Sequence, residues 1–284
     1  MHPTRPVLPA LDVVQEWADR HGLALVHIEM GDDPFRVPAP DGLGACDLVV
    51  ALGGDGTVLT ALHAASETHT PVLGVACGSL GALSTVSEGE LTAGHDRIAG
   101  GEWWPRRLPA LAAETADGRV LHAINDLVLV RRGGTQLIVE VMVGDDLYAR
   151  PAGDGVIVAT PLGSSAYTMA AGGPLLVEGV AGLVCTPLAM HGGCAPPVVV
   201  PGDRDITVAA EGGHGGFDVE VDGHRVESAA KRFVVSVQDD YATLVGLGDP
   251  ESGLPRLRRR GLIVDSPRVL ARDAREQPTA ETPL

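Results

Sequence analysis

Residues 47–65 read Asp47-Leu-Val-Val-Ala-Leu-Gly-Gly-Asp-Gly-Thr-Val-Leu-Thr-Ala-Leu-His-Ala-Ala65. The short apolar run before the glycines is typical of a strand buried on both faces of a parallel sheet, and the run after them has helical spacing. Gly53–Thr57 therefore forms a strand-to-helix turn, where glycine accepts positive φ and allows another molecule close to the backbone. The stretch predicts an α/β fold in which the free N–H groups of a helix N-terminus suit a phosphate.

Asp55 is the unexpected residue of this turn. Because a carboxylate repels phosphate, Asp55 predicts another task, such as holding a sugar hydroxyl or removing its proton. The alternative is that Asp55 or Thr57 only caps the helix. Glycine-rich turns are common in α/β folds, so the turn alone does not choose between these interpretations.

The composition narrows the function classes. The chain has 284 residues, enough for two domains, and its net charge of −16 and pI of about 4.9 argue against binding to nucleic acid or acidic membranes. The sequence shows neither the apolar core of a signal peptide nor a membrane-spanning run, so we expect a cytoplasmic protein. Cys46, Cys77, Cys185 and Cys194 lack zinc-site spacing and predict small buried residues of a reducing compartment.

Helix and strand patterns alternate around the opening stretch. We expect a helix over 8–21, a strand over 23–28, a loop over 31–44, and a strand over 71–76 that ends in the glycine turn 78–81. This alternation predicts a doubly wound parallel sheet with both glycine turns at the carboxyl ends of strands, where ligands bind. Such units normally open on a strand, whereas this sequence opens on a turn-like segment and a helix. Either the chain starts late or the first strand has been lost.

After Trp104 the pattern changes to strands joined by tight turns. Strand-like runs occupy residues 120–124, 126–130, 137–143, 156–159, 217–221, 224–226 and 233–237. Gly144–Asp146 and Asp222-Gly223 are typical of hairpin turns.

The sequence therefore predicts two domains and a C-terminal extension. We expect an α/β domain over residues 1–104 and a β-rich, β-sandwich-like domain over 105–245. Residues 246–273, which include an amphipathic run, are expected to pack back on the first domain. The composition of residues 274–284 predicts a flexible tail.

Two further stretches carry polar residues suited to nucleotides. Asn125-Asp126 interrupts an apolar run, which alone is typical of a turn. Residues 153–168 read Gly153-Asp-Gly-Val-Ile-Val-Ala-Thr-Pro-Leu-Gly-Ser-Ser-Ala-Tyr-Thr168 and lead to Ala171-Gly-Gly-Pro174. A strand, a small-residue turn and a helix present backbone donors and hydroxyls to phosphates, and Tyr167 offers a ring face for a base.

Together these motifs resemble those of the NAD kinase family. The motifs that stand in the family's order and approximate spacing are Gly53–Thr57, Asn125-Asp126, Asp154–Ile157, Thr160–Thr168, Ala171–Pro174 and Asp222-Gly223. The resemblance covers about residues 45–245. The GGDG tetrapeptide also occurs in lipid kinases and phosphofructokinases, whereas the 154–174 stretch is far more specific and resembles NAD kinases.

The sequence departs from the family pattern at several positions. Asp126 stands where Glu is more common, and Leu162 and Ser165 stand where Thr is usual. Thr60 and Ser79 replace basic residues of the family. Two positive charges are therefore absent near the expected phosphates.

The resemblance implies a phosphotransferase that uses ATP and Mg²⁺ to phosphorylate the adenosine-ribose 2′-hydroxyl of NAD, giving NADP, with Asp55 as general base. The phosphates rather than protein ligands would hold the metal. The resemblance implies a nucleotide site lined by Gly53, Gly54, Gly56, Thr57, Asn125, Asp126, Asp154, Gly163, Ser164, Ser165, Ala166, Tyr167, Thr168 and His224. It also implies a homodimer or homotetramer, and it leaves ATP and polyphosphate open as phosphoryl donor.

Two alternatives remain. Thr60, Ser79, Leu162 and the missing first strand favour a catalytically weak NAD(P)-binding regulatory relative, which would bind the dinucleotide without making product. Another GGDG-type kinase, such as a lipid kinase, is disfavoured by the acidic composition and by the 154–174 stretch.

Overall fold

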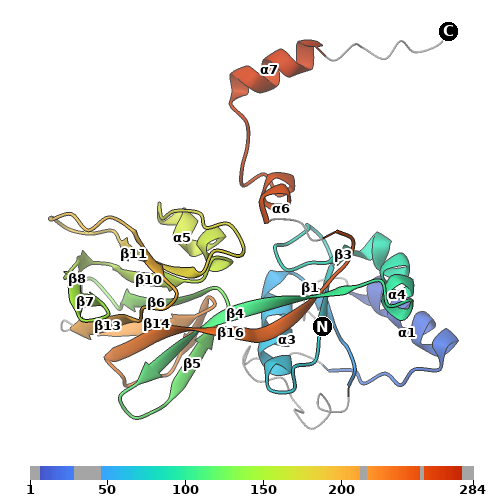
Figure 1. Ribbon diagram of the computed structural model, residues 1–284, viewed down its shortest axis with the longest axis horizontal. Coiled ribbons are helices and arrows are strands. Elements are labelled where there is room, and N and C mark those ends of the chain that lie inside the picture. The colour runs from blue at the N-terminus through green and yellow to red at the C-terminus, as the bar shows by residue number, and fades with distance from the viewer. Residues whose placement is uncertain (1–6, 29–45, 212–215, 250–252, 277–284) are drawn as a thin grey trace. The chain divides into compact units, whose positions relative to one another are not determined.

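The computed structural model describes residues 7–28, 46–211, 216–249 and 253–276 (Figure 1). The chain divides into two compact units, residues 1–250 and 251–284. The second unit contains α6 (Gly253–Arg259) and α7 (Pro267–Glu276). In these ranges, none of the helices combines the length and apolar character needed to cross a bilayer.

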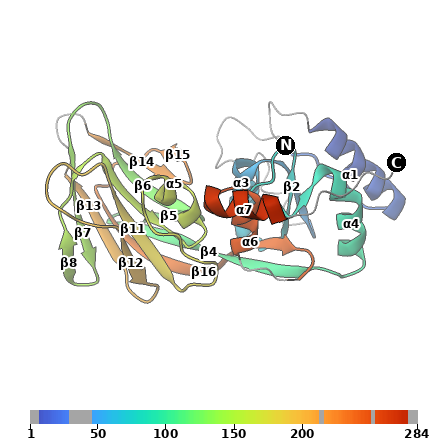
Figure 2. The same ribbon diagram turned by 90° about the horizontal axis from the view of Figure 1, so that it is seen from above.

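The α/β part of the first unit has helices on both faces of a parallel sheet. Its elements are α1 (Leu8–His21), β1 (Val49–Gly53), α3 (Asp55–Ser66), β2 (Val72–Ala76), β3 (Val86–Ser87), the 3₁₀ helix η1 (Glu88–Glu90) and α4 (Leu91–Ala99). β2 pairs in parallel with both β1 and β3. Ala51 packs with α3 on one face of the sheet, and the next residue, Leu52, packs with α1 and α4 on the other. Figure 2 shows α1 and α4 side by side. The predicted doubly wound sheet is confirmed.

Local sequence explains the helix ends. α1 begins with a proline in its first turn, where the missing N–H costs nothing, and ends at Gly22 in the left-handed conformation, with φ +65°. Gly54 precedes α3 in an extended conformation, so the helix starts directly at Asp55.

The expected strand over residues 23–28 is wrong. This segment has no regular structure, and Leu23 and Val26 are 49% and 58% exposed. A strand needs a neighbour for its backbone groups. Within the described ranges, β1 lies at the edge of the sheet and pairs only with β2, and residues 23–28 form no ladder with it. The expected loop over 31–44 lies outside the described residues.

The β-rich part of the first unit is a sandwich of two sheets. One sheet has the order β12-β11-β10-β6-β14-β15, and the other continues the α/β sheet as β1-β2-β16-β13-β7-β8 with β3, β4, β5 and β9 beside this path. Alternate residues such as Leu127, Leu129, Val156 and Val158 point into the core between the sheets, as the period of two requires. Phe233 lies fully buried there.

The strands of the sandwich have the following bounds. In chain order they are β4 (Trp104–Thr115), β5 (Val120–Ala123), β6 (Asp126–Arg131), β7 (Leu137–Val143), β8 (Asp146–Ala149), β9 (Ala152–Gly153), β10 (Gly155–Ala159), β11 (Gly182–Leu188), β12 (Val198–Pro201), β13 (Ile206–Glu211), β14 (Phe217–Val221), β15 (His224–Val226) and β16 (Arg232–Gly246). The 3₁₀ helix η2 (Gly163–Ser165) and α5 (Tyr167–Ala170) follow β10.

β4 and β16 belong to both parts of the first unit. They pair antiparallel along almost their whole length, with an irregularity between Gln238 and Ala242, and Leu244 of β16 also pairs with Val72 of β2. Figure 1 shows the two strands running from the sandwich into the α/β part. The expected strand over 233–237 is therefore only part of β16. A boundary at residue 104, and the packing of 246–273 on the first domain, stay predictions.

Other expectations have mixed outcomes. The β7–β8 and β14–β15 hairpins are confirmed. Cys77 and Cys185 are buried, and burial raises the pKa of the Cys185 thiol to about 12, but Cys46 is half-buried and Cys194 is exposed, so the expectation of four buried cysteines is wrong. The segment predicted as a tail is helical up to Glu276, and its flexibility stays a prediction.

Phe233→Ala tests the role of the sandwich core. Phe233 is fully buried in that core, so we expect the substitution to lower the free energy of unfolding by about 3–5 kcal/mol, measured by urea denaturation. The matched control is Leu147→Ala, at a 51% exposed position, with an expected change of about 0.5 kcal/mol. Equal losses in the two variants would contradict the assigned core.

Candidate functional site

Asp55 joins the two glycine turns that follow β1 and β2. Its Oδ2 accepts a hydrogen bond from the Ala82 N–H at 2.9 Å, and its Oδ1 accepts one from the Leu83 N–H at 3.0 Å. A Cβ at Gly81 would lie 1.9 Å from Oδ1, so only glycine allows this approach. The predicted meeting of both turns at the carboxyl ends of the strands is confirmed.

The helix-cap alternative for Asp55 and Thr57 is wrong. Gly54 is the N-cap of α3, and no side chain makes a capping hydrogen bond there. Thr57 is buried, and its Oγ1 has no hydrogen-bond partner among the described residues. A Cβ at Gly53 would lie 2.3 Å from this oxygen, so Gly53 is required for the close packing of Thr57.

The Asn125-Asp126 pair forms a turn whose backbone is held from two sides. The carboxylate of Asp222 accepts hydrogen bonds from the N–H groups of Ile124 (2.9 Å), Asn125 (2.7 Å) and Asp126 (3.1 Å). Thr160 donates its hydroxyl to the Ile124 carbonyl and its N–H to the Asn125 carbonyl. Because these hydrogen bonds fix the backbone of the turn, they also fix the positions from which the Asn125 and Asp126 side chains extend.

The predicted loop 160–168 packs directly on this turn. A Cβ at Gly163 would lie 2.0 Å from the Asn125 carbonyl oxygen, which explains the glycine. The expected helix is only the four residues of α5, after the 3₁₀ turn η2. The Ser164 hydroxyl donates to the Pro161 carbonyl and accepts from the Leu176 N–H, so it holds the loop itself.

Other predicted residues of the loop lie in different surroundings. The Ser165 hydroxyl donates to the Leu162 carbonyl, and Thr168 is buried. Ala166 connects η2 to α5. Tyr167 is 42% exposed, which leaves part of its ring available for a ligand.

Acidic side chains gather around Tyr167. Burial first, and then the charges of Glu220, Asp154 and Asp126, raise the pKa of the Tyr167 hydroxyl. Asp126 is itself buried; burial first, and then the charges of Asp222 and Glu220, raise its pKa to about 7. The structure therefore brings the Asn125-Asp126 pair and the stretch 153–168 together.

Asp154 is fixed by an arginine that the sequence analysis did not select. Arg131 Nε donates to Asp154 Oδ1 at 2.6 Å, and the Arg131 N–H donates to the Asp154 carbonyl. Gly155 follows with φ +153°, and a Cβ there would lie 1.9 Å from the Leu129 carbonyl oxygen. His224 begins β15 opposite Val221 and is partly exposed.

Sequence reasoning also missed His63 and the role of Asp222. His63 lies on α3 and contacts Asp222 and Tyr241 through its two ring nitrogens, at 2.7 Å and 2.9 Å. The available signal was a histidine within an apolar helical run, together with an aspartate that opens a hairpin turn.

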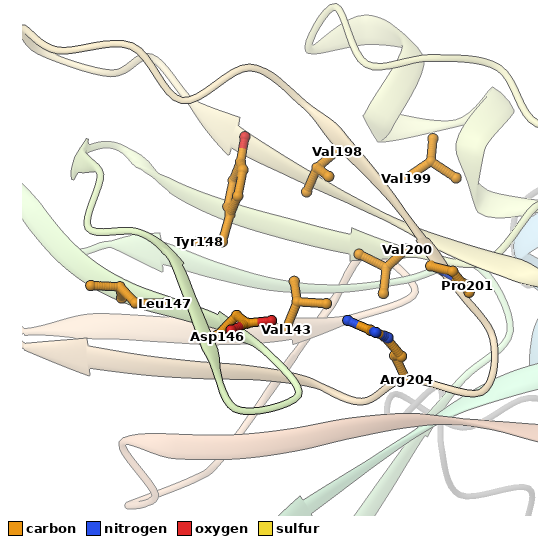
Figure 3. A pocket seen from close by; sticks show the side chains of 9 residues that line it. All are labelled: Val143, Asp146, Leu147, Tyr148, Val198, Val199, Val200, Pro201 and Arg204. Carbon is orange, nitrogen blue, oxygen red and sulfur yellow. The ribbon is translucent and has the colours of Figure 1, made fainter.

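A separate hollow lies in the β-sandwich. Its volume is about 450 Å³, and it lies between β8 and β12 (Figure 3). The residues that line it are Val143, Asp146, Leu147, Tyr148, Val198, Val199, Val200, Pro201 and Arg204. None of the predicted site residues is among them, so the hollow is not part of the candidate site.

This architecture defines the class of two-part proteins in which a doubly wound α/β sheet continues into a β-sandwich. Sequence profiles agree: the ATP-NAD kinase N-terminal domain matches residues 42–102, and the ATP-NAD kinase C-terminal domain matches residues 124–244. The chain belongs to the NAD kinase family.

Individual relatives extend this comparison. The NAD kinase of Heliobacterium modesticaldum is 35% identical over 75% of this chain and 80% of its own length. The NAD kinase of Halorubrum lacusprofundi is 41% identical over 61% of this chain, and the match spans 64% of that relative, just under two thirds.

Solved structures share the fold. Yeast NADH kinase complexed with NADH superimposes with a TM-score of 0.76 at 21% identity, covering 93% of this chain and 86% of that one. An NAD kinase from Archaeoglobus fulgidus in complex with ATP gives a TM-score of 0.69 at 24% identity, covering 89% and 92%. The predicted fold class is confirmed.

The titration of Asp126 gives a test of the acidic turn. Because the pKa of Asp126 is raised from 3.8 to about 7 in the folded protein, the folded state binds more protons than the unfolded state between these values. The contribution of Asp126 to the free energy of unfolding should therefore fall as pH rises from about 4 to 7. Asp126→Asn removes this dependence, so its stability relative to the parent should rise over that range, by at most about 1.4 kcal/mol per pH unit.

Urea denaturation from pH 4 to 8 measures this difference. Asp145→Asn, in the exposed turn between β7 and β8, is the matched control and should follow the parent at every pH. An Asp126→Asn curve parallel to that of the parent would contradict the raised pKa.

Proposed function

We propose that this chain transfers the γ-phosphoryl group of ATP to the 2′-hydroxyl of the adenosine ribose of NAD, forming NADP and ADP. The observation that carries the proposal is the carboxylate of Asp55, held by two backbone N–H groups where both glycine turns meet. Membership of the NAD kinase family supplies the reaction class.

Asp55 has the properties of a positioned general base. A carboxylate has about four lone-pair sites, and the N–H groups of Ala82 and Leu83 occupy two of them. In the proposed step this carboxylate accepts the proton of a ribose hydroxyl while the hydroxyl oxygen attacks the γ-phosphorus and ADP leaves. Because the backbone fixes the carboxylate before substrate arrives, orientation costs little at the moment of reaction.

The two glycine turns, residues 53–57 and 78–83, contain no lysine or arginine. Other groups must therefore neutralise the charge of the phosphates. Thr60 is buried, and its hydroxyl donates to the Gly56 carbonyl. Buried Arg106 is bound to Glu178 and lies 3.5 Å from the Ala82 carbonyl, so its cation supports the turn that holds Asp55. We propose that the N–H groups of Gly53–Thr57 and of residues 78–80 contact phosphate oxygens, since those of Ala82 and Leu83 are bound to Asp55.

We propose that Mg²⁺ enters the site as an ion carried by ATP. Among the described residues, no group of three or more His, Cys, Asp or Glu side chains is arranged to hold a metal. When bound with ATP, the ion would supply positive charge to the transferred phosphoryl group. Polyphosphate is the alternative donor.

The acidic cluster around Tyr167 is the proposed dinucleotide site. Asn125, Asp126 and Asp154 offer acceptors for ribose hydroxyls or base N–H groups, and the exposed part of Tyr167 offers a stacking face. His224 is proposed as a further contact. We also propose a homodimer or homotetramer.

A regulatory NAD(P)-binding protein is the second candidate function. Thr60 and Ser79 favour it, because these uncharged residues beside the glycine turns add nothing to phosphate neutralisation. The two candidates differ in turnover, because only the kinase forms NADP.

Asp55→Asn tests the proposed base. In a coupled assay with NAD, ATP and Mg²⁺, we expect the parent to form NADP and the variant to lose about a hundredfold in rate, since amide nitrogen cannot accept the proton. Asp145→Asn, an exposed exchange of the same type, should keep the parental rate. A parent that makes no NADP while NAD raises its melting temperature would instead support the regulatory candidate.

Gly81→Ala tests the support of Asp55 without changing the carboxylate. A methyl group 1.9 Å from Oδ1 must displace the carboxylate from the Ala82 and Leu83 N–H groups, so NADP formation should fall about tenfold or more. Gly89→Ala is the matched control, because its added Cβ meets nothing within 4 Å. Parental activity in Gly81→Ala, at unchanged melting temperature, would show that this support is unnecessary.

A further inference from the structure

We propose that His63 is a positioning residue of the dinucleotide site. It holds the carboxylate of Asp222, and this carboxylate holds the backbone of the Asn125-Asp126 turn. The positioning step stands on the contacts of His63 and Asp222 themselves. Only the consequence for the dinucleotide rests on the proposed function.

Asp222 is a buried acceptor for a whole turn. Its side chain is 1% exposed, and its two oxygens accept hydrogen bonds from three consecutive N–H groups, those of residues 124–126. Its own N–H donates to the Asp126 carbonyl at 2.9 Å, so Asp222 and Asp126 each donate a backbone hydrogen bond to the other residue. The backbone φ of Asp222 is +50°, an uncommon value that the D-G turn imposes. The position of this carboxylate therefore sets where Asn125 and Asp126 lie.

His63 supplies a further donor to this carboxylate. Its Nε2 lies 2.7 Å from Asp222 Oδ2, and its Nδ1 lies 2.9 Å from the Tyr241 hydroxyl. Because an ionised carboxylate only accepts, Nε2 must carry a proton, and in the neutral ring Nδ1 then accepts from Tyr241. The Tyr241 ring stacks on His122 with centroids 4.9 Å apart. The imidazole is thus oriented from both of its nitrogens.

The helix that carries His63 also carries Asp55. The two residues are eight positions apart on α3, about 12 Å along the helix axis. Asp55 binds the turn after β2, and His63 binds the carboxylate beneath the Asn125 turn. Helix α3 therefore connects the proposed base with the proposed dinucleotide turn through two hydrogen-bonded ends.

Packing alone does not account for this arrangement. Val58, Leu62 and Ile124 already pack in one hydrophobic cluster, which holds the helix against the turn without a histidine. A leucine at position 63 would leave that cluster unchanged in its members and leave Asp222 with its three N–H donors. What His63 adds is a directional bond to the group that fixes the turn.

Three variants separate positioning from stability. His63→Leu removes both ring contacts, whereas His63→Gln keeps an N–H donor near the position of Nε2. His95→Leu is the matched control for loss of a buried imidazole: His95 is 1% exposed, and its ring nitrogens have no hydrogen-bond partner in the part of the chain that the structure describes.

Hydrogen exchange of the amides of residues 124–126 measures the positioning step without any ligand. We expect exchange about tenfold or more faster in His63→Leu, and parental rates in His63→Gln and His95→Leu. Equal protection in His63→Leu and His95→Leu would overturn the proposal.

Calorimetric titration with NAD measures the functional step. We expect the dissociation constant to rise about tenfold or more in His63→Leu and to recover within about threefold in His63→Gln. In the kinase assay, KM for NAD should rise more than kcat falls. If the parent forms NADP but His63→Leu binds NAD normally, the inference fails and the proposed function stands; if the parent binds no NAD, the proposed function fails, and hydrogen exchange still decides the positioning step.

Discussion

The carboxylate of Asp222, buried and bound by backbone N–H groups, is the interaction on which the candidate site depends. A buried charge without partners costs several kcal/mol, so the segments that supply its donors must stay in place for the carboxylate to remain there. Those segments are the turn at residues 124–126 and helix α3. The D-G turn between β14 and β15 therefore organises residues a hundred positions earlier in the chain.

Asp55, the first residue of α3, is held in the same way as Asp222. There too a carboxylate is held by consecutive backbone N–H groups, from Ala82 and Leu83. Two acidic residues thus anchor loops that contain no lysine or arginine. Strands β4 and β16 connect the two parts of the first unit, because they carry residues of both hydrophobic cores. Through them the α/β sheet and one sheet of the sandwich form a single sheet.

The sequence predicted much of this fold because its signals are local. The strand-turn-helix at residues 47–65 and the D-G hairpin follow from apolar period and turn chemistry, and both are confirmed. The strand expected over 23–28 failed because strand formation depends on a partner that the segment itself does not encode. His63 and Arg131 were missed for the same reason: their partners, Asp222 and Asp154, are distant in sequence.

The charge distribution of the site argues for how a dinucleotide would lie in it. The charges of Asp126, Asp154 and Glu220 act on the Tyr167 hydroxyl. Carboxylates repel phosphate but accept hydrogen bonds from hydroxyl and base N–H groups. The glycine turns, in contrast, offer backbone N–H groups and α3 its positive end. An anionic dinucleotide therefore gains most when its riboses and bases face the acidic cluster and its phosphates face away from it. We propose that in this orientation a ribose hydroxyl is the group presented to Asp55, and that the donor phosphates meet the backbone dipoles of the glycine turns.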